Sequence, residues 1–137
     1  MNNYIDEILK EAEKSYDNLD IPIGAIVVKN GVIIGRGHNE RVEVPDVTNH
    51  AEIMAIREAE KYINDWRLNG CDLYVTLYPC DMCIEIIKAA RVDNVYYLLE
   101  KDNKNKYEGT IFNKVINNEK EAEYKEKLST FFKDNLR

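Results

Sequence analysis

Long apolar runs are missing from this sequence of 137 residues. No stretch approaches the roughly 20 consecutive apolar residues that a helix needs to cross a bilayer. The first residues, Met1 to Glu7, also lack the basic start and the apolar stretch of a secretory signal. These absences predict a cytoplasmic protein that makes no contact with a membrane.

An excess of positive charge is missing too. The formal net charge is −6, whereas a protein that coats nucleic acid needs clustered Lys and Arg on its surface. The charge is unevenly distributed, because residues 101–137 carry +2 and the first 100 residues carry −8. If the chain binds a polyanion, the C-terminal segment is therefore the expected contact.

Cysteine and histidine are scarce, with three and two residues respectively. Three cysteines in a cytoplasmic chain are more typical of metal ligands, catalytic thiols or buried residues than of disulfides. At this length, and with 45% hydrophobic residues, the chain is expected to fold as a single domain over residues 1–137.

The spacing of apolar residues predicts alternating helices and strands. Helices are expected at 3–17, at 50–63, from around Asp81, near 110–117 and at 119–135, and strands at 22–28, 32–35, 72–77 and 94–99. Asn30-Gly31 between the first two strands is a strong hairpin signal. The last two strands and the helix between them form a βαβ unit, so they should run parallel. This order predicts an α/β fold with a mixed central sheet and helices on its faces, and the polar segment 100–108 is expected to be a loop.

Two short segments carry the chemistry: His50-Ala51-Glu52 and Pro79-Cys80-Asp81-Met82-Cys83. Each lies where a helix is expected to begin. Zn²⁺ takes N and S ligands tetrahedrally, and a catalytic site uses three protein ligands and one open position. His50, Cys80 and Cys83 supply that number, and the Cys-x-x-Cys spacing lets both sulfurs on a first helical turn reach one ion. Helix N-termini also favour thiolates.

Glu52 is the predicted proton shuttle beside this zinc. Residues i and i+2 do not share a helix face, so His50 and Glu52 converge only at an irregular helix start. A carboxylate there takes the proton of a zinc-activated water and passes it to a leaving amine. These parts suit hydrolysis at an amidine-like ring carbon, and H-x-E…P-C-x-x-C is the known signature of zinc deaminases.

Simpler interpretations compete with this one. A Cys-x-x-Cys pair alone is often half of a structural zinc site or a redox pair. A closed structural site needs a fourth ligand, and the candidates are poor: Cys71 is expected to be a small buried residue at a strand entry, and His38 lies just past the hairpin. The joint pattern favours a catalytic zinc.

The sequence resembles the cytidine deaminase superfamily over most of its length. Within it, the likeness is greatest to the bacterial tRNA adenosine deaminases, which convert the wobble adenosine of a tRNA anticodon to inosine. The segments that carry the resemblance are 22–28, 35–39, 50–57, 66–68, 73–77, 79–83 and 128–133.

This resemblance implies a three-layer α/β/α fold, with zinc held by His50, Cys80 and Cys83 and with Glu52 as the proton shuttle. It also implies that Asn39 hydrogen-bonds a flipped-out base, which meets the backbone near Ala51. From the residues alone, Asn39 could instead be a turn residue that closes its strand. The resemblance further implies a homodimer with the site near the subunit interface.

Three functions therefore compete, and the first is favoured. A tRNA adenosine deaminase is expected to gather basic residues of the tail beside the zinc site, namely Lys101, Lys104, Lys106, Lys125, Lys127, Lys133 and Arg137. A deaminase of a free base or nucleoside, of the guanine or cytosine type, is the alternative, because Tyr78 and Asn49 stand where the tRNA enzymes commonly have Glu and Ala. The third is a non-catalytic, zinc-stabilised binding module.

Overall fold

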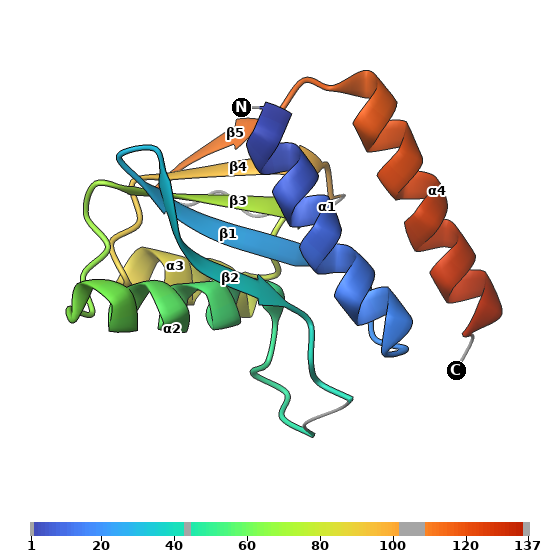
Figure 1. Ribbon diagram of the computed structural model, residues 1–137, viewed down its shortest axis with the longest axis horizontal. Coiled ribbons are helices and arrows are strands. Elements are labelled where there is room, and N and C mark those ends of the chain that lie inside the picture. Colours follow the sequence, from blue (N-terminus) through green and yellow to red (C-terminus); the bar gives the residue numbers. More distant parts are fainter. Residues whose placement is uncertain (1, 43–44, 102–108, 136–137) are drawn as a thin grey trace.

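A computed structural model of the chain describes residues 2–42, 45–101 and 109–135. Its helices and strands alternate as shown in Figure 1. In chain order they are α1 (Asn2–Asp17), β1 (Gly24–Lys29), β2 (Val32–His38), α2 (Ala51–Ile63), β3 (Cys71–Leu77), α3 (Asp81–Ala89), β4 (Asn94–Leu99), β5 (Ile111–Lys114) and α4 (Asn118–Asp134). No helix in these ranges is both long and apolar enough to cross a membrane.

The sheet is mixed, in the order β2-β1-β3-β4-β5. Strand β1 is antiparallel to β2 and β3, whereas β3, β4 and β5 run parallel to one another. Figure 1 shows α2 and α3 along one face of the sheet and α1 and α4 on the other. Two apolar clusters follow this division, one under α2 and α3 and one under α1 and α4. The expected three-layer α/β/α fold and the parallel βαβ unit are confirmed.

The predicted hairpin joins β1 and β2. Asn30 and Gly31 both have positive φ, 50° and 78°, as a two-residue type I′ connection requires. This turn sets the pairing of Lys29 with Val32, and an irregularity between Val27 and Val28 then shifts the register by one residue, so that Gly24 lies opposite His38. The end of β2 is thereby brought beside the start of β1, from which the site is built.

The helix expected near residues 110–117 is wrong. Residues Ile111–Lys114 form β5, a parallel strand at the edge of β4. β-branched and aromatic residues such as Ile111 and Phe112 suit a strand, and four residues can complete a ladder along β4 where so short a helix would bury almost nothing. The following helix begins only at Asn118, after Asn117 caps it by accepting from the Lys120 amide at 3.1 Å. Residues 102–108 of the expected loop lie outside the described part of the chain.

Helix α2 packs closely on β2 because the contact is built from very small residues. Ala51, Ala55 and Ala59 face the sheet and are fully buried. A Cβ at Gly37 would collide with the carbonyl oxygen of Ala51, so only glycine permits this approach. The first turn of α2, which carries the predicted catalytic residues, is therefore held directly against the end of β2.

Candidate metal and catalytic site

The three predicted metal ligands come together at the starts of two helices. His50 is the N-cap residue of α2 and Cys80 that of α3; both have extended backbones, and neither side chain caps its own helix. Cys83 lies in the first turn of α3 and is fully buried. The ligand atoms of these residues all lie within 4.8 Å of one another. Two helix N-termini, which favour negative charge, thus converge on one point.

The distances within this group match a tetrahedral zinc site. His50 Nδ1 lies 3.8 Å from Cys80 Sγ and 3.5 Å from Cys83 Sγ. Bonds of about 2.1 Å to nitrogen and 2.3 Å to sulfur, at a tetrahedral angle, separate the two atoms by about 3.6 Å. The two nitrogen–sulfur distances therefore fit zinc, and Nδ1 is the nitrogen that faces the metal position.

The protonation states of the two cysteines favour binding of a cation. Hydrogen bonds from Cys83 and His50 outweigh the effect of burial and lower the pKa of the Cys80 thiol to about 3. The pKa of Cys83 is raised, because its thiol hydrogen-bonds to Cys80 and is itself buried. One sulfur is therefore a thiolate at neutral pH, and a bound metal ion would displace the proton of the other.

Glu52 lies beside the ligands with an unsatisfied acceptor. Its side chain is buried, and within the described residues Oε1 is the one buried side-chain oxygen or nitrogen without a hydrogen-bond partner. Burial, together with the charge of Cys80, raises the pKa of this carboxyl group to about 7. Leaving a buried polar atom unpaired costs about 1–3 kcal/mol, so such an atom calls for a functional explanation.

Asn39 is buried at the end of β2, with three of its polar groups engaged. Its Oδ1 accepts from the Ala51 amide at 2.8 Å, and its backbone N–H donates to the Ile23 carbonyl at 3.2 Å. Its backbone carbonyl accepts from Ser15 Oγ at 2.9 Å. Nδ2 makes no hydrogen bond within the described part of the chain, and unlike Glu52 Oε1 it retains slight contact with solvent. Asn39 thus joins β2 to the start of α2, and Nδ2 remains for another partner.

The two residues predicted to bind a base, Asn39 and Ala51, are joined directly by this bond. Because the Ala51 amide is already engaged, any contact between the base and the backbone near Ala51 must use other atoms. That contact stays a prediction.

No fourth protein ligand accompanies the group in the ranges that the structure covers. Cys71 is fully buried at the start of β3, as expected from the sequence, and burial raises the pKa of its thiol. His38 is held between two acids, with Nδ1 3.4 Å from Glu11 and Nε2 2.9 Å from Glu40. A site with three protein ligands leaves one tetrahedral position for a reactant.

Sequence reasoning missed Asp20, which supports the segment that follows Asn39. This buried carboxylate accepts from Arg41 Nη2 at 3.1 Å and from the Val42 amide at 3.0 Å. An acidic residue at the entry to an apolar strand, directly before Ile21-Pro22, was the available signal. The carboxyl end of α4 lies close by, because Phe131 and Phe132 line an apolar hollow of about 250 Å³ together with Arg41.

Only some of the basic residues predicted to gather beside the zinc site lie within the described part of the chain. Lys133 belongs to the end of α4 that approaches the segment after Asn39, whereas Lys127 lies nearer the middle of the helix and pairs with Glu13. Lys104, Lys106 and Arg137 lie outside the described residues.

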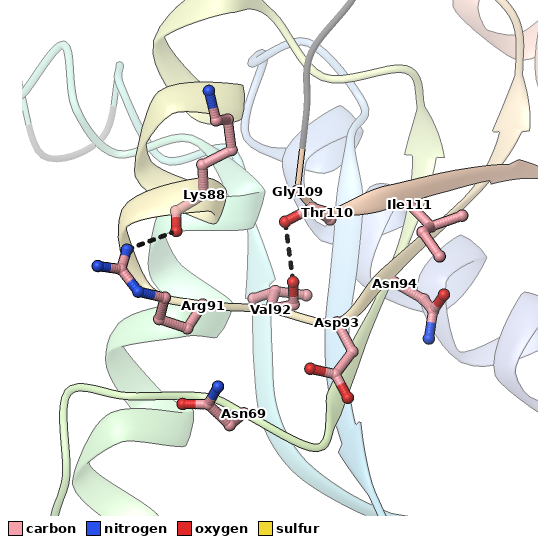
Figure 2. A pocket seen from close by; sticks show the side chains of 9 residues that line it. All are labelled: Asn69, Lys88, Arg91, Val92, Asp93, Asn94, Gly109, Thr110 and Ile111. Carbon is pink, nitrogen blue, oxygen red and sulfur yellow. Dashed lines mark hydrogen bonds between the residues drawn. The ribbon is translucent and has the colours of Figure 1, made fainter.

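A second hollow, of about 580 Å³, opens at the opposite end of the β3-α3-β4 unit (Figure 2). Lys88, Arg91 and Asp93 project around it, and Thr110 Oγ1 closes one side by donating to the Val92 carbonyl at 2.8 Å. None of the predicted site residues lines it. The candidate site is therefore distinguished by its chemistry and not by the size of a cavity.

Comparison with known proteins agrees with this geometry. Residues 1–99 match the family model described as the cytidine and deoxycytidylate deaminase zinc-binding region. The chain is 50% identical over 94 residues to a tRNA-specific adenosine deaminase of Streptococcus pyogenes serotype M18, covering 69% of this chain and 59% of that protein. It is 45% identical over 94 residues to the corresponding protein of Bacillus subtilis, covering 69% and 58%. The matched segment thus spans less than two thirds of these curated relatives.

Two solved structures are similar over nearly the whole chain. One comes from studies of A-to-I editing by tRNA:A34 deaminases at the wobble position of transfer RNA. It has a TM-score of 0.83 and 31% identity, with 90% of this chain and 99% of that chain covered. The other is guanine deaminase from Bacillus subtilis, with a TM-score of 0.69, 29% identity and 91% of each chain covered.

Proposed function

Because the chain belongs to the cytidine and deoxycytidylate deaminase zinc-binding family, we propose that it is a zinc-dependent deaminase that converts the wobble adenosine of a tRNA anticodon to inosine. The observation that carries the chemistry is the unpartnered Oε1 of Glu52, buried beside three convergent zinc ligands. A structural zinc site does not require an unpartnered carboxylate oxygen beside the metal, whereas a hydrolytic deaminase requires one to accept a proton from water.

The roles of the residues follow from their positions. His50 Nδ1, Cys80 and Cys83 would hold the metal ion. Zinc, when bound, supplies a nucleophile near neutral pH because it lowers the pKa of water to about 7. Glu52 Oε1 accepts a proton from the attacking water and releases it to the amine that leaves as ammonia. A carboxyl group can perform both steps, because it accepts a proton as a carboxylate and donates it again as an acid.

Asn39 is the proposed anchor for the base. Its Oδ1 and both backbone groups are engaged, so Nδ2 can donate to an acceptor on the ring. Since Asn39 is bonded to Ala51, the neighbour of Glu52, a base held by Nδ2 lies close to the proton shuttle.

Support for tRNA as the substrate comes from the relatives. The curated proteins with 44–50% identity carry that activity in their names, and so does the structure with a TM-score of 0.83. The proposal is tested by incubating zinc-loaded protein with an anticodon stem-loop that has adenosine at the wobble position. Mass spectrometry of the digested RNA should detect inosine at that position alone. Absence of inosine, together with turnover of a free base, would overturn the choice of substrate.

Guanine is the second candidate substrate, favoured by the similarity to the guanine deaminase structure. Free guanine, cytosine, cytidine and adenosine belong in the same assay, with ammonia as the common product. Salt separates the two classes, because binding to phosphates weakens steeply as salt rises and binding of a neutral base does not.

We also propose a cytoplasmic homodimer, formed through the outer side of α2 and α3. Exposed Trp66 borders a hollow there, which Ile53, Ile56 and Ile86 also line. Three cysteines without disulfides agree with a reducing compartment. Sedimentation velocity should show a dimer for the parent chain and a monomer for Ile86→Glu. A monomeric parent would contradict the assembly.

A further inference from the structure

Three consecutive residues at the start of β1 connect elements that are far apart in the sequence. The Pro22 carbonyl accepts from the Tyr124 hydroxyl at 2.8 Å. The Ile23 carbonyl accepts from the Asn39 amide, and the Gly24 amide donates to Thr76 Oγ1 at 3.2 Å. Segment 22–24 therefore links α4, the end of β2 and the end of β3, the strand that leads to Cys80.

Tyr124 enters this segment from α4. The helix has only two buried side chains, Tyr124 and Phe131, and the Tyr124 ring is almost inaccessible to solvent. A phenylalanine would fill the same space, so the buried hydroxyl matters for the bond it makes and not for packing.

Ser15 of α1 holds Asn39 from the other side. Its Oγ is fully buried and donates to the Asn39 carbonyl, across 24 residues of sequence. Helix α1 also packs directly on the linking segment, because a Cβ at Gly24 would collide with the carbonyl oxygen of Ile8. The two polar groups of the Asn39 backbone are thus fixed from two helices, one directly by Ser15 and one through Ile23.

We propose that Tyr124 and Ser15 are positioning residues for substrate binding, which hold the Asn39 backbone so that its side-chain amide is aimed at the base. Neither residue touches the metal ligands or the reacting atoms. They act through segment 22–24 and through Asn39. The proposal rests on the role given to Asn39 above, and it assigns to α1 and α4 a part in substrate affinity.

The proposal predicts that loss of either hydroxyl changes KM much more than kcat. Loss of either hydroxyl should let Asn39 shift while leaving Glu52 and the zinc ligands in place. The start of α2 is also held by its close contact with Gly37, and the end of β3 by the bond from the Tyr78 amide to the Leu99 carbonyl. KM for the substrate should therefore rise about three- to tenfold, as expected for one weakened hydrogen bond, while kcat changes less than about twofold. Zinc content should remain that of the parent.

The experiment compares Tyr124→Phe and Ser15→Ala with Tyr16→Phe. Tyr16 lies at the same contact between α1 and α4, where its ring packs edge-on against Phe131, and no hydrogen bond joins it to segment 22–24 within the described residues. Steady-state kinetics are measured on whichever substrate the parent turns over, well below the unfolding temperature. Raised KM in the first two variants with an unchanged KM in Tyr16→Phe is expected. Unchanged KM in all three would overturn the proposal, as would an equal rise in the control.

Amide hydrogen exchange supplies a readout that does not depend on deamination. The Asn39 and Ala51 amides should exchange at least about tenfold faster in Tyr124→Phe and Ser15→Ala than in the parent, and at the parental rate in Tyr16→Phe. If the parent turns over no substrate, the proposed function fails while this structural claim is still decided. Equal exchange in parent and variants would show that the two hydroxyls do not hold Asn39.

Discussion

The two faces of the sheet hold their helices in different ways. On the face covered by α2 and α3, small residues bring backbones together, as at Gly37 and Ala51. On the face covered by α1 and α4, one such close approach, of α1 to Gly24, is accompanied by contacts of tyrosine rings and by ion pairs. The ring of Tyr4 in α1 packs against Tyr74 with centroids 4.9 Å apart, and Glu11 binds Arg36 at 3.3 Å.

This difference distinguishes the face that carries the candidate catalytic residues from the face that supports them. Close backbone packing leaves little freedom, so it suits the helix starts that must hold a metal ion and a proton shuttle within fractions of an ångström. Contacts made by single side chains can be changed one at a time without moving the metal ligands. Changes on the first face should therefore affect zinc and turnover, and changes on the second should affect stability and substrate affinity.

The largest effect is expected at Cys83, on the first face. Cys83→Ala removes one of three ligands, so zinc should fall from about one per chain to almost none and ammonia release should fall to background. Atomic absorption of the purified protein measures the metal. Cys71→Ala is the matched control, because Cys71 is equally buried but lies outside the ligand group. Full zinc content in Cys83→Ala would refute the ligand assignment.

Glu52→Gln should separate metal binding from proton transfer. The amide keeps the shape of the side chain but cannot shuttle a proton, so turnover should fall by about 10²- to 10⁴-fold while zinc content is unchanged. Ammonia release at saturating substrate gives the rate. Glu60→Gln, on the same helix, should keep parental activity. If Glu52→Gln were as active as the parent, Glu52 Oε1 could not be the proton shuttle.

On the second face, Glu11 should make stability depend on pH. Burial by itself raises the pKa of this carboxyl group, but hydrogen bonds from His38, Lys14 and Arg36 prevail and lower it to about 2. A group with a depressed folded-state pKa contributes stability above its unfolded value, near 4.5, and loses that contribution as pH falls toward 2.

The corresponding loss is up to about 3 kcal/mol of unfolding free energy. Urea unfolding at a series of pH values measures it. Glu11→Gln should flatten the curve between pH 4.5 and 2, whereas exposed Glu58→Gln should leave it unchanged. Parallel curves for Glu11→Gln and its parent would contradict the assignment.

The smallest predicted effect is a loss of unfolding free energy when either of two glycines is replaced by alanine. Gly37→Ala forces α2 away from β2 and should lower the unfolding free energy by about 2 kcal/mol. Gly31→Ala meets no neighbouring atom and carries only the strain of a positive φ, which is about 1 kcal/mol. Urea unfolding of both variants shows which of them loses more unfolding free energy. A larger loss at Gly31 would show that the approach of α2 to β2 is not as tight as the structure has it.

Much of this arrangement is readable from the sequence because its signals are local. Asn30-Gly31 specifies a turn by its own backbone preferences, and the ligand motifs place three metal donors at helix starts. The strand at Ile111–Lys114 escaped prediction, since four apolar and polar residues are ambiguous until the edge of β4 is present to pair with them.

The supporting residues depend still more on the folded state. Tyr124 and Pro22 are 102 residues apart, so no sequence window contains both. Ser15 reads simply as a polar position on an amphipathic helix until the Asn39 carbonyl is seen beside it. Asp20 acquires its role only when Arg41 and Val42 fold back onto it.

Ammonia release during stepwise zinc loading tests most directly whether this is a zinc-dependent deaminase. Protein stripped with a chelator is loaded in steps and assayed with the anticodon stem-loop and with the free bases. Turnover should rise in proportion to bound zinc and level off at about one ion per chain, because a single ligand group holds the metal. No ammonia from any of these substrates at full zinc occupancy would contradict the proposed function.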